Sequence, residues 1–408
     1  MRPTIFATSY SELCVIPSFR RYVCGQSFSM AGDAICLAAL PIALINSGYD
    51  AATFGIIMAC VGLGTFIGAG LGGSWTEYFS ARTILIITDL VRGICQLVAA
   101  AVIAGMTHWL WLAAVYLCFG LGIGGSRPAA HVMLVELVPS SKLIAANSWL
   151  AFLDNSIAVL LPATMGVMLI LTNPLWGVVI DGITFMIAAS LTSFVPVTPP
   201  VDRSHNEASE RTWLRGFRII DRIPPLKLGL RATLVINVLC FPVFLVVAPY
   251  TVADRFSDSL WGLSLAASGL GACLGAITAV VTYAHLRITI LCAFACLALT
   301  LAMCLIAVGD AMTLILLGAV LIGFVEGIWL TAWATVMQMH SPAPDLGIVV
   351  GTETALTSGI HPFIYLGGGS MGASIGYDST LSLTALASLG ALLLILFGAL
   401  KSSRKSRA

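Results

Sequence analysis

The chain has 408 residues, of which 59% are hydrophobic and only 10% are charged. An ordinary soluble domain has roughly 25% charged residues, so a soluble globule could not cover its surface with this composition. Twenty Lys and Arg balance 19 Asp and Glu, so there is no basic surplus that would point to nucleic acid. The composition excludes a soluble enzyme, a disordered chain and a secreted disulfide scaffold, and it favours a membrane protein.

The eleven cysteines form no disulfide framework or metal-binding pattern. Most lie within apolar runs, and none forms a CxxC pair or a Cys/His cluster, so we interpret them as buried thiols. The sequence also has no catalytic triad, zinc signature or phosphate-binding loop. We therefore expect neither an enzyme nor a bound metal or cofactor.

Twelve apolar runs of roughly 20 residues are each long enough to cross a hydrocarbon core. The first is too long for the core of a signal peptide and has no cleavage site, so we expect it to remain as a helix. The runs cover residues 22–45, 53–73, 84–105, 109–130, 145–171, 175–195, 228–250, 260–283, 288–308, 311–336, 347–372 and 380–400.

Lys and Arg are concentrated in alternate loops between these runs, and the opposite loops hold only Arg255. The positive-inside rule then places both termini in the cytoplasm of a multi-pass protein of the cell (inner) membrane. The longest polar stretch, 196–227, is predicted to be a cytoplasmic linker. It would join a six-helix half at 1–195 to a second half at 228–400, with a basic tail at 401–408.

The two halves share a glycine pattern at a constant offset of 207 residues. Close helix packing alone could produce such a pattern, but its recurrence at the same place in each half favours an internal repeat. Two halves related by an axis along the membrane normal are one transporter architecture. The matched positions are Phe54, Gly55, Gly62, Gly64 and Gly68 with Trp261, Gly262, Gly269, Gly271 and Gly275.

The segment from Gly73 to Arg82, GSWTEYFSAR, resembles the loop signature G-x-x-x-D-R-x-G-R-R of the major facilitator superfamily. Both end residues match, and Glu77 replaces the aspartate. Further stretches are similar to the drug:proton antiporter branch that contains macrolide-efflux and siderophore-export proteins. They begin at Phe19, Gly32, Leu40, Asp89, Arg127, Glu136 and Ala146.

The resemblance implies an all-α fold with twelve transmembrane helices in two pseudo-symmetric six-helix halves. It also implies that helices one, four, seven and ten line a central cavity. The signature departs from the family pattern at Tyr78, Ser80 and Ala81, and the fifth helix keeps only Pro162 and Gly166 of the antiporter signature.

Ionisable groups at membrane depth cost about 2.5 kcal/mol or more, so they usually face the protein interior or an aqueous cavity. Asp33, near the centre of the first span, and Glu326, near the centre of the tenth, are candidate proton carriers. Arg127 in the fourth span could pair with one of them when no substrate or proton is bound. The alternative is a buried structural ion pair or hydrogen bond.

Polar or aromatic stripes at helical spacing accompany these groups, and they predict a substrate-binding surface on the cavity-lining helices. Ordinary helix packing is the alternative for the aromatic residues. The predicted substrate-binding residues are Gln26, Tyr116, Asn237, Phe241, Phe244, Trp329 and Trp333.

Asp89 and Arg92 share a helix face and, with Glu77 and Arg82, resemble the family's charged cytoplasmic gate. A solvated helix end is the alternative. Asp181, near the outer side, is expected to reach the interface by snorkelling. The predicted gating residues are Gly73, Glu77, Arg82, Asp89, Arg92, Asp154 and Glu353.

The function predicted from these features is export of a small, largely apolar drug, antibiotic or siderophore-like compound by proton antiport with alternating access. The expected partners are the small-molecule substrate, protons and the bilayer, without nucleic acid, and a monomer suffices. Two alternatives stay open. One is uptake or facilitated passage of a lipid or metabolite, and the other is a membrane receptor or scaffold that does not transport.

Overall fold

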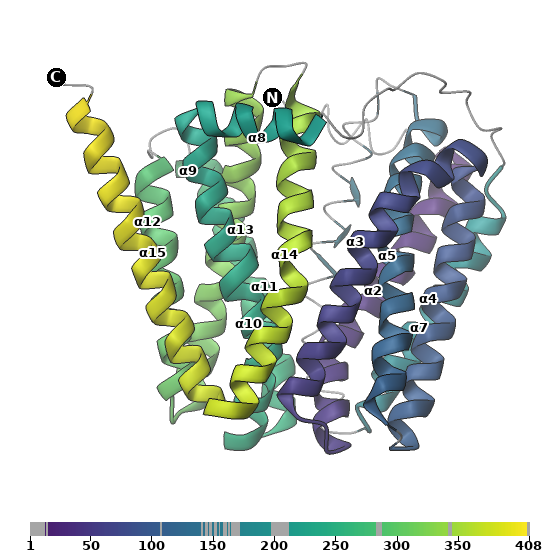
Figure 1. The fold of residues 1–408 in the computed structure, drawn as a ribbon. Helices are drawn as coiled ribbons and strands as arrows, with labels where there is room; N and C mark the ends of the chain where they lie inside the picture. The colour runs from purple at the N-terminus through teal and green to yellow at the C-terminus, as the bar shows by residue number, and fades with distance from the viewer. Residues whose placement is uncertain are drawn as a thin grey trace. The chain divides into compact units, whose positions relative to one another are not determined.

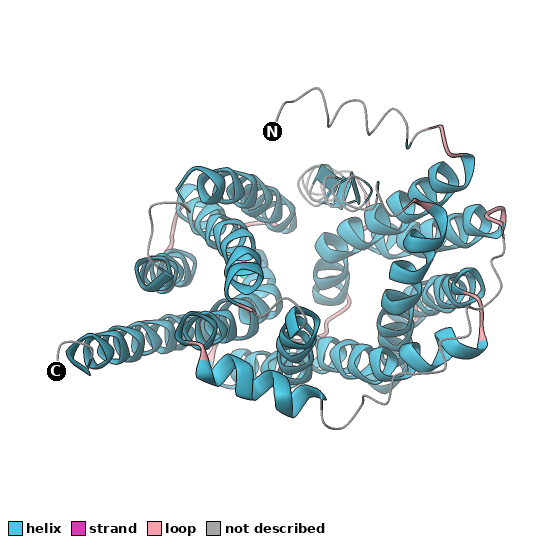
Figure 2. Cartoon of the chain, turned by 90° about the horizontal axis from the view of Figure 1, so that it is seen from above, coloured by secondary structure: helices cyan, strands magenta, loops and turns pink. Residues whose placement is uncertain are grey.

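A computed structural model describes residues 15–106, 108–139, 172–196, 212–282, 288–341 and 345–405, with Leu13 and a few single residues between 140 and 171. All regular elements in these ranges are helices (Figure 2). Ten of the helices are long and apolar enough to cross a membrane, and each coincides with an expected span. The all-α membrane fold predicted from the sequence is therefore confirmed.

The two other expected spans differ from these ten. The fifth, 145–171, lies mostly outside the described residues. The eleventh is helix α14 (Leu346–Ile375), which is 30 residues long, and its apolar sequence is interrupted by Glu353 and His361. A helix of this length can cross a bilayer when its polar face is turned towards protein, so α14 as the eleventh span stays a prediction.

The chain divides into two compact units (Figure 1). The N-terminal unit comprises residues 1–49 and 60–205, and the C-terminal unit comprises 50–59 and 206–408. The N-terminal unit contains α2 (Pro17–Asn46), α4 (Ala81–Ala104), α5 (Trp109–Leu137) and α7 (Leu175–Ser193). Helix α3 (Ala51–Tyr78) belongs to both units, because residues 51–59 are part of the C-terminal unit and the rest is part of the N-terminal unit.

The C-terminal unit holds the remaining helices and a π-helical segment, η2, that joins α9 to α10. A π-helical turn widens the helix locally and is frequent at functional sites. The elements are α8 (Thr212–Arg222), α9 (Pro224–Thr233), η2 (Leu234–Cys240), α10 (Phe241–Arg255), α11 (Asp258–Thr282), α12 (Ile288–Val308), α13 (Met312–His340), α14 and α15 (Tyr377–Lys405).

Helix α4 turns its polar residues inwards. Lipid tails are as apolar as a protein core, so large apolar side chains can cover its exposed face, whereas polar groups need partners inside the unit. The exposed side chains include Ile87, Leu90, Val91, Ile94, Leu97 and Val98. The buried ones include Thr88, Asp89, Arg92 and Gln96.

Arg255, the one cation of the predicted outer loops, stabilises a helix end. Its guanidinium donates hydrogen bonds to the carbonyl oxygens of Ile306, in the last turn of α12, and of Gly309, directly after it, at 3.1 and 3.2 Å. It also forms an ion pair of 2.6 Å with Asp378 in the first turn of α15. A cation satisfies the orphan carbonyls at a helix C-terminus, which gives this exception to the charge pattern a structural reason.

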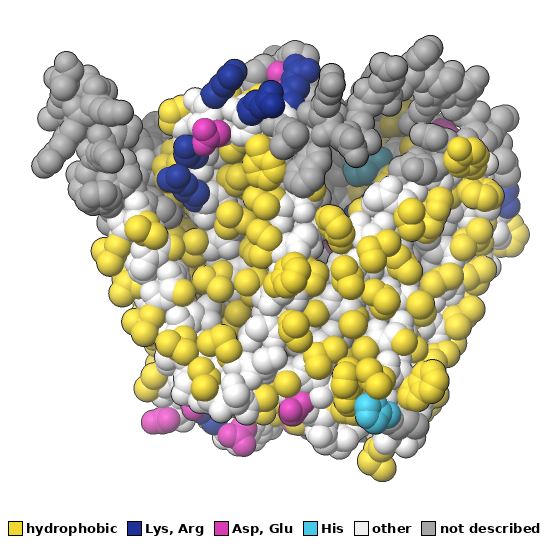
Figure 3. Space-filling view, in the orientation of Figure 1, with side chains coloured by type: hydrophobic (Ala, Val, Ile, Leu, Met, Phe, Trp, Pro, Cys, Tyr) yellow, Lys and Arg dark blue, Asp and Glu magenta, His cyan; other side chains and the backbone are white. Residues whose placement is uncertain are grey.

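The basic residues of the predicted linker region gather over α8 and α9 (Figure 3). Two of them form ion pairs: Arg215 with Asp345, at 2.6 Å, and Lys227 with Asp221, at 2.5 Å. The Lys227 ammonium holds the pKa of the exposed Asp221 carboxyl below its usual range. This concentration of Lys and Arg is consistent with the predicted cytoplasmic position of the region. The orientation of the chain in the membrane stays a prediction.

Two of the glycine pairs that suggested a repeat lie at matching helix contacts in the two units. Glycines of α3 face the backbone of α5, and glycines of α11 face the backbone of α13, so closely that an added Cβ would collide with it. The contacts, in matching order, are Gly64 with Leu117 and Gly68 with Leu121, then Gly271 with Val320 and Gly275 with Phe324. The contacts also run in the other direction. Gly120 and Gly124 of α5 face the backbone of α3, and Gly323 and Gly327 of α13 face the backbone of α11. The two units therefore contain the same kind of close helix–helix contact at corresponding positions, as expected for an internal repeat.

Replacing Gly120 with Ala should destabilise the protein, because the new methyl group would collide with the carbonyl oxygen of Val61. Overpacking of this kind costs about 1–3 kcal/mol. Thermal unfolding of the purified protein in detergent would show the loss as a lower midpoint. Gly70→Ala is the matched control, since no atom lies within 4 Å of its Cβ position. Equal midpoints for the two variants would contradict the proposed helix contact.

Candidate functional site

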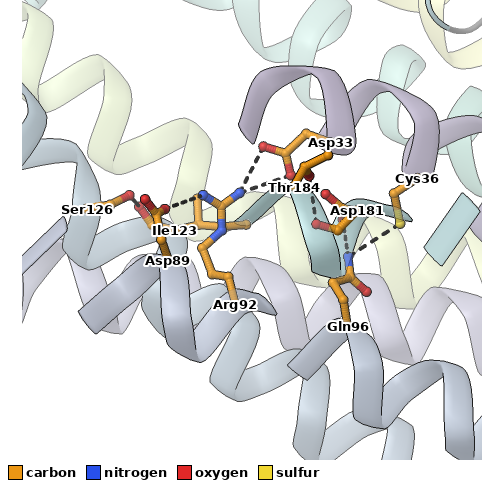
Figure 4. Close-up of polar contacts among 9 residues, drawn as sticks. All are labelled: Asp33, Cys36, Asp89, Arg92, Gln96, Ile123, Ser126, Asp181 and Thr184. Carbon is orange, nitrogen blue, oxygen red and sulfur yellow. Dashed lines mark hydrogen bonds and ion pairs between the residues drawn. The ribbon is translucent and has the colours of Figure 1, made fainter. Parts of the chain in front are cut away.

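An ion pair between α2 and α4 lies at the centre of the candidate site (Figure 4). One terminal nitrogen of Arg92 lies 2.9 Å from both carboxylate oxygens of Asp33. The Arg92 side chain is 9% exposed and that of Asp33 is 45% exposed. The cation is thus held inside the unit, whereas its partner carboxylate is partly exposed.

Aromatic rings and a second carboxylate complete the environment of Arg92. Its guanidinium carbon lies 3.9 Å from the ring centroid of Phe185 and 5.2 Å from that of Phe119, within reach of cation–π attraction. The other terminal nitrogen lies 3.9 Å from Oδ1 of Asp89, whose Oδ2 has no hydrogen-bond partner among the described residues. Arg92 therefore stands between a close carboxylate on α2 and a more distant one on its own helix.

A second polar group lies beside this ion pair, around Asp181 of α7. The carboxylate is fully buried, and the amide nitrogen of Gln96 donates to its Oδ2 at 2.5 Å. The Tyr116 hydroxyl donates to the amide oxygen of Gln96 at 3.1 Å, and the Cys36 sulfur lies 3.4 Å from the amide nitrogen. Figure 4 shows the contacts among Cys36 of α2, Gln96 of α4 and Asp181 of α7. With Tyr116 of α5, four helices of the N-terminal unit contribute to one buried network.

A glycine makes room for this network. A Cβ at Gly32 would collide with the hydroxyl of Thr184 and with Oδ1 of Asp181. The Thr184 hydroxyl is itself engaged, because it donates to the carbonyl oxygen of Asp181 at 2.7 Å. Gly32 thus allows α7 to approach α2 closely, while the next residue, Asp33, supplies the carboxylate that pairs with Arg92.

The snorkelling predicted for Asp181 is wrong, because its side chain lies inside the unit and is bonded to Gln96. Sequence reasoning also missed Gln96 and Cys36. A usable signal was present: Asp89, Arg92 and Gln96 follow one another at i, i+3 and i+7, so they share a face of α4. The solvated helix end considered for Asp89 and Arg92 is likewise excluded, since both residues are buried.

Other predicted residues of the N-terminal unit lie apart from this network. Arg127 is exposed and has no ion-pair partner within the described ranges, while Gln26 is half-buried. Arg82 donates to the backbone carbonyl of Ser193 at the end of α7. Asp154 is exposed. Gly73 and Glu77 belong to helix α3, but their side chains lie outside the described residues.

The predicted residues of α13 pack within the C-terminal unit. The rings of Trp329 and Trp333 are stacked at 6.1 Å, and the Trp329 indole nitrogen donates to the hydroxyl of Thr233 at 3.1 Å. Both rings are buried. Glu326 is half-buried and has no hydrogen-bond or ion-pair partner among the described residues of this unit. Its role as a proton carrier, and that of the tryptophans in substrate binding, stay predictions.

The predicted residues of the seventh span surround the π-helix. Asn237 lies within η2, and its carbonyl oxygen is 2.9 Å from Nε2 of His361 on α14. Phe241 is half-buried at the start of α10, and Phe244 is buried with its ring 5.4 Å from that of Trp261. Glu353 is half-buried on α14.

The polar network, the repeated glycine contacts and the ten apolar helices describe a polytopic membrane protein with ionisable groups enclosed between its helices. The family model described as Major Facilitator Superfamily matches residues 22–364. The chain belongs to this superfamily. It is therefore a multi-pass membrane transporter and not an enzyme, as the sequence predicted.

Comparison with single proteins agrees with this assignment. The chain is 25% identical to the multidrug efflux pump Tap of Mycolicibacterium fortuitum over 362 residues, which cover 86% of this chain and 88% of that protein.

Solved structures with the same fold include the nucleoside transporter NupG, with a TM-score of 0.73 and 13% identity, covering 93% of this chain and 98% of that one. The POT family transporter PepTSo has a TM-score of 0.71 and 11% identity, covering 95% and 99% of the two chains. At these identities the two structures show the fold alone.

Proposed function

We propose that this transporter exports a small, largely apolar compound from the cytoplasm in exchange for protons, by alternating access. The observation that carries the proposal is the Asp33–Arg92 ion pair, in which the carboxylate is accessible and the cation is buried. The likeness to a multidrug efflux pump supports export as the direction of transport.

The geometry supports a proton-dependent exchange of partners. Protonation of Asp33 removes its negative charge and with it most of its attraction for Arg92. Among the described residues, the nearest other carboxylate oxygen for the guanidinium is Oδ1 of Asp89, 3.9 Å away, and the neighbouring Oδ2 has no hydrogen-bond partner there. A shift of about 1 Å would bring Arg92 to hydrogen-bond distance from Asp89.

This exchange would alter the attachment between helices. In the ionised state Arg92 links α4 to α2 through Asp33. In the protonated state it would instead pair with Asp89 on its own helix. Proton binding would thus release α2 from α4 and favour a different conformation, provided that substrate and proton prefer different states.

Inside-out membrane vesicles with an acidic lumen test the proposal. Ethidium and a panel of fluorescent apolar compounds serve as probes, added outside, where the cytoplasmic face is exposed. Export by proton antiport predicts accumulation that stops when the pH gradient is dissipated. Gradient-driven accumulation only in right-side-out vesicles would support the alternative of uptake, and equal flux with and without a gradient would refute proton coupling.

A further inference from the structure

Asp181 is the most enclosed carboxyl group of the described N-terminal unit. Its side chain is inaccessible, the amide of Gln96 donates to its Oδ2, and the Cys36 thiol is a second side-chain partner of the carboxyl group. Oδ1 is buried without a hydrogen-bond partner among the described residues. A carboxylate in such a setting lacks the donors that normally stabilise its charge.

The charged groups around Asp181 do not compensate for this deficit. From α2 it faces Asp33 and the Cys36 thiol, from α4 it faces Arg92, and from α5 the Tyr116 hydroxyl reaches it through Gln96. Asp89 is a further carboxyl group on the α4 face that carries Arg92. The network therefore contains three carboxyl groups and a single guanidinium, which forms its close ion pair with Asp33. The exposed Asp154 is a further carboxyl group that acts on Asp33, so it adds to the negative charge.

We infer that Asp181 is a second proton-binding site of the N-terminal unit, and that it holds a proton while Asp33 is ionised and paired with Arg92. The charge count carries the inference. With all three carboxyl groups ionised, the network would have a net negative charge between membrane-embedded helices, which is costly. Because Arg92 neutralises Asp33, the proton belongs on a carboxyl group that has no close cation.

Gln96 is suited to both forms of Asp181. A primary amide presents a donor on one side and an acceptor on the other, and the two are exchanged by rotating the group. Its nitrogen can donate to an ionised Asp181, and its oxygen can accept from a protonated one. The Tyr116 hydroxyl can donate or accept and so can follow either orientation. Gln96 therefore acts as a positioning residue for the proton on Asp181.

The inference rests on the proposed function, because the proton on Asp181 would be used in the same exchange of substrate for protons. When Asp33 takes up a proton, one negative charge disappears and the Arg92 cation is released. Both changes favour loss of the proton from Asp181. The two carboxyl groups would then be protonated in alternation, and the O–H bond made at Asp33 would be matched by one broken at Asp181.

Infrared difference spectra of the purified transporter in lipid, recorded while the pH is raised, test this site. The expected result is a carboxylic-acid C=O band that disappears with increasing pH, is absent in Asp181→Asn and is retained in Asp33→Asn. Gln96→Leu should shift the frequency of this band without removing it, because the acid loses its hydrogen-bond partner. Asp310→Asn, at an exposed loop carboxyl, is the matched control and should leave the band unchanged.

The outcomes separate this site from the proposed function. A band that does not respond to pH, or that remains in Asp181→Asn, would overturn the inference even if proton-driven export is observed. A pH-sensitive Asp181 band in a protein without proton-driven export would sustain the site and refute the proposed function. If Asp181→Asn does not fold, the shift caused by Gln96→Leu still identifies the band, with ¹³C-labelled aspartate to distinguish it from glutamate.

Discussion

Asp33→Asn is expected to abolish proton-driven export without loss of folded protein. The amide is neutral at every pH of the assay, so Arg92 would stay in the position that it takes when Asp33 is protonated and could no longer alternate between partners. Because the site is half exposed and Asp89 is near Arg92, the fold should tolerate the loss of this charge. Export by vesicles with an imposed pH gradient should fall at least about tenfold, the factor that corresponds to 1.4 kcal/mol.

Two further variants define the specificity of that effect. Asp33→Glu keeps a titratable group and should retain part of the coupled flux. Asp310→Asn removes an exposed carboxylate between α12 and α13 and should transport like the wild type. Size-exclusion chromatography of the purified variant checks that it is folded. Undiminished proton-coupled flux in a folded Asp33→Asn variant would refute the assignment of Asp33 as the proton carrier.

Arg92→Ala is expected to cause the largest loss of stability of any single charge removal in the described N-terminal unit. The side chains of Arg92 and Asp89 are 9% and 3% exposed, so the variant leaves a buried carboxylate without a cation. Breaking a buried pair in this way costs about 3–5 kcal/mol. Thermal unfolding in detergent should show a much lower midpoint.

A second substitution tests the cause of that loss. If the unpaired carboxylate is responsible, Arg92→Ala combined with Asp89→Asn should be more stable than Arg92→Ala alone, because the uncompensated charge is gone. Arg231→Ala, at an exposed cation of α9, is the control and should change the midpoint little. A single Arg92→Ala variant with wild-type stability would contradict the buried ion-pair network.

The sequence predicted the helices well because the signal for a spanning helix is local. An apolar run of sufficient length can satisfy its backbone only as a helix in lipid, whatever its neighbours are. Ten of the twelve expected spans coincide with long apolar helices of the structure. The repeat was also predictable, since Gly64 and Gly271 occupy corresponding positions in the two units and bare backbone at such positions permits close helix contact.

The partners of the ionisable residues were not predictable in the same way. The sequence separated Asp33, expected to carry protons, from Arg92, expected to act at a gate, whereas the structure joins them at 2.9 Å. Asp181 was expected at the interface and is buried with Gln96. Spacing along one helix shows which residues share a face, but it does not show which neighbouring helix that face meets.

By itself, the sequence determined that the chain is an all-helical membrane protein with a repeated architecture. It also showed that a few ionisable residues lie at membrane depth. Composition and periodicity settle these features, because the cost of exposing polar groups to lipid acts on each helix separately. Only the tertiary structure decided that α2, α4 and α7 bring three carboxyl groups to the surroundings of a single guanidinium, with Tyr116 of α5 bonded to Gln96 beside them. That grouping depends on how helices pack, through contacts such as Gly32 against α7, and packing joins residues that are distant in the chain.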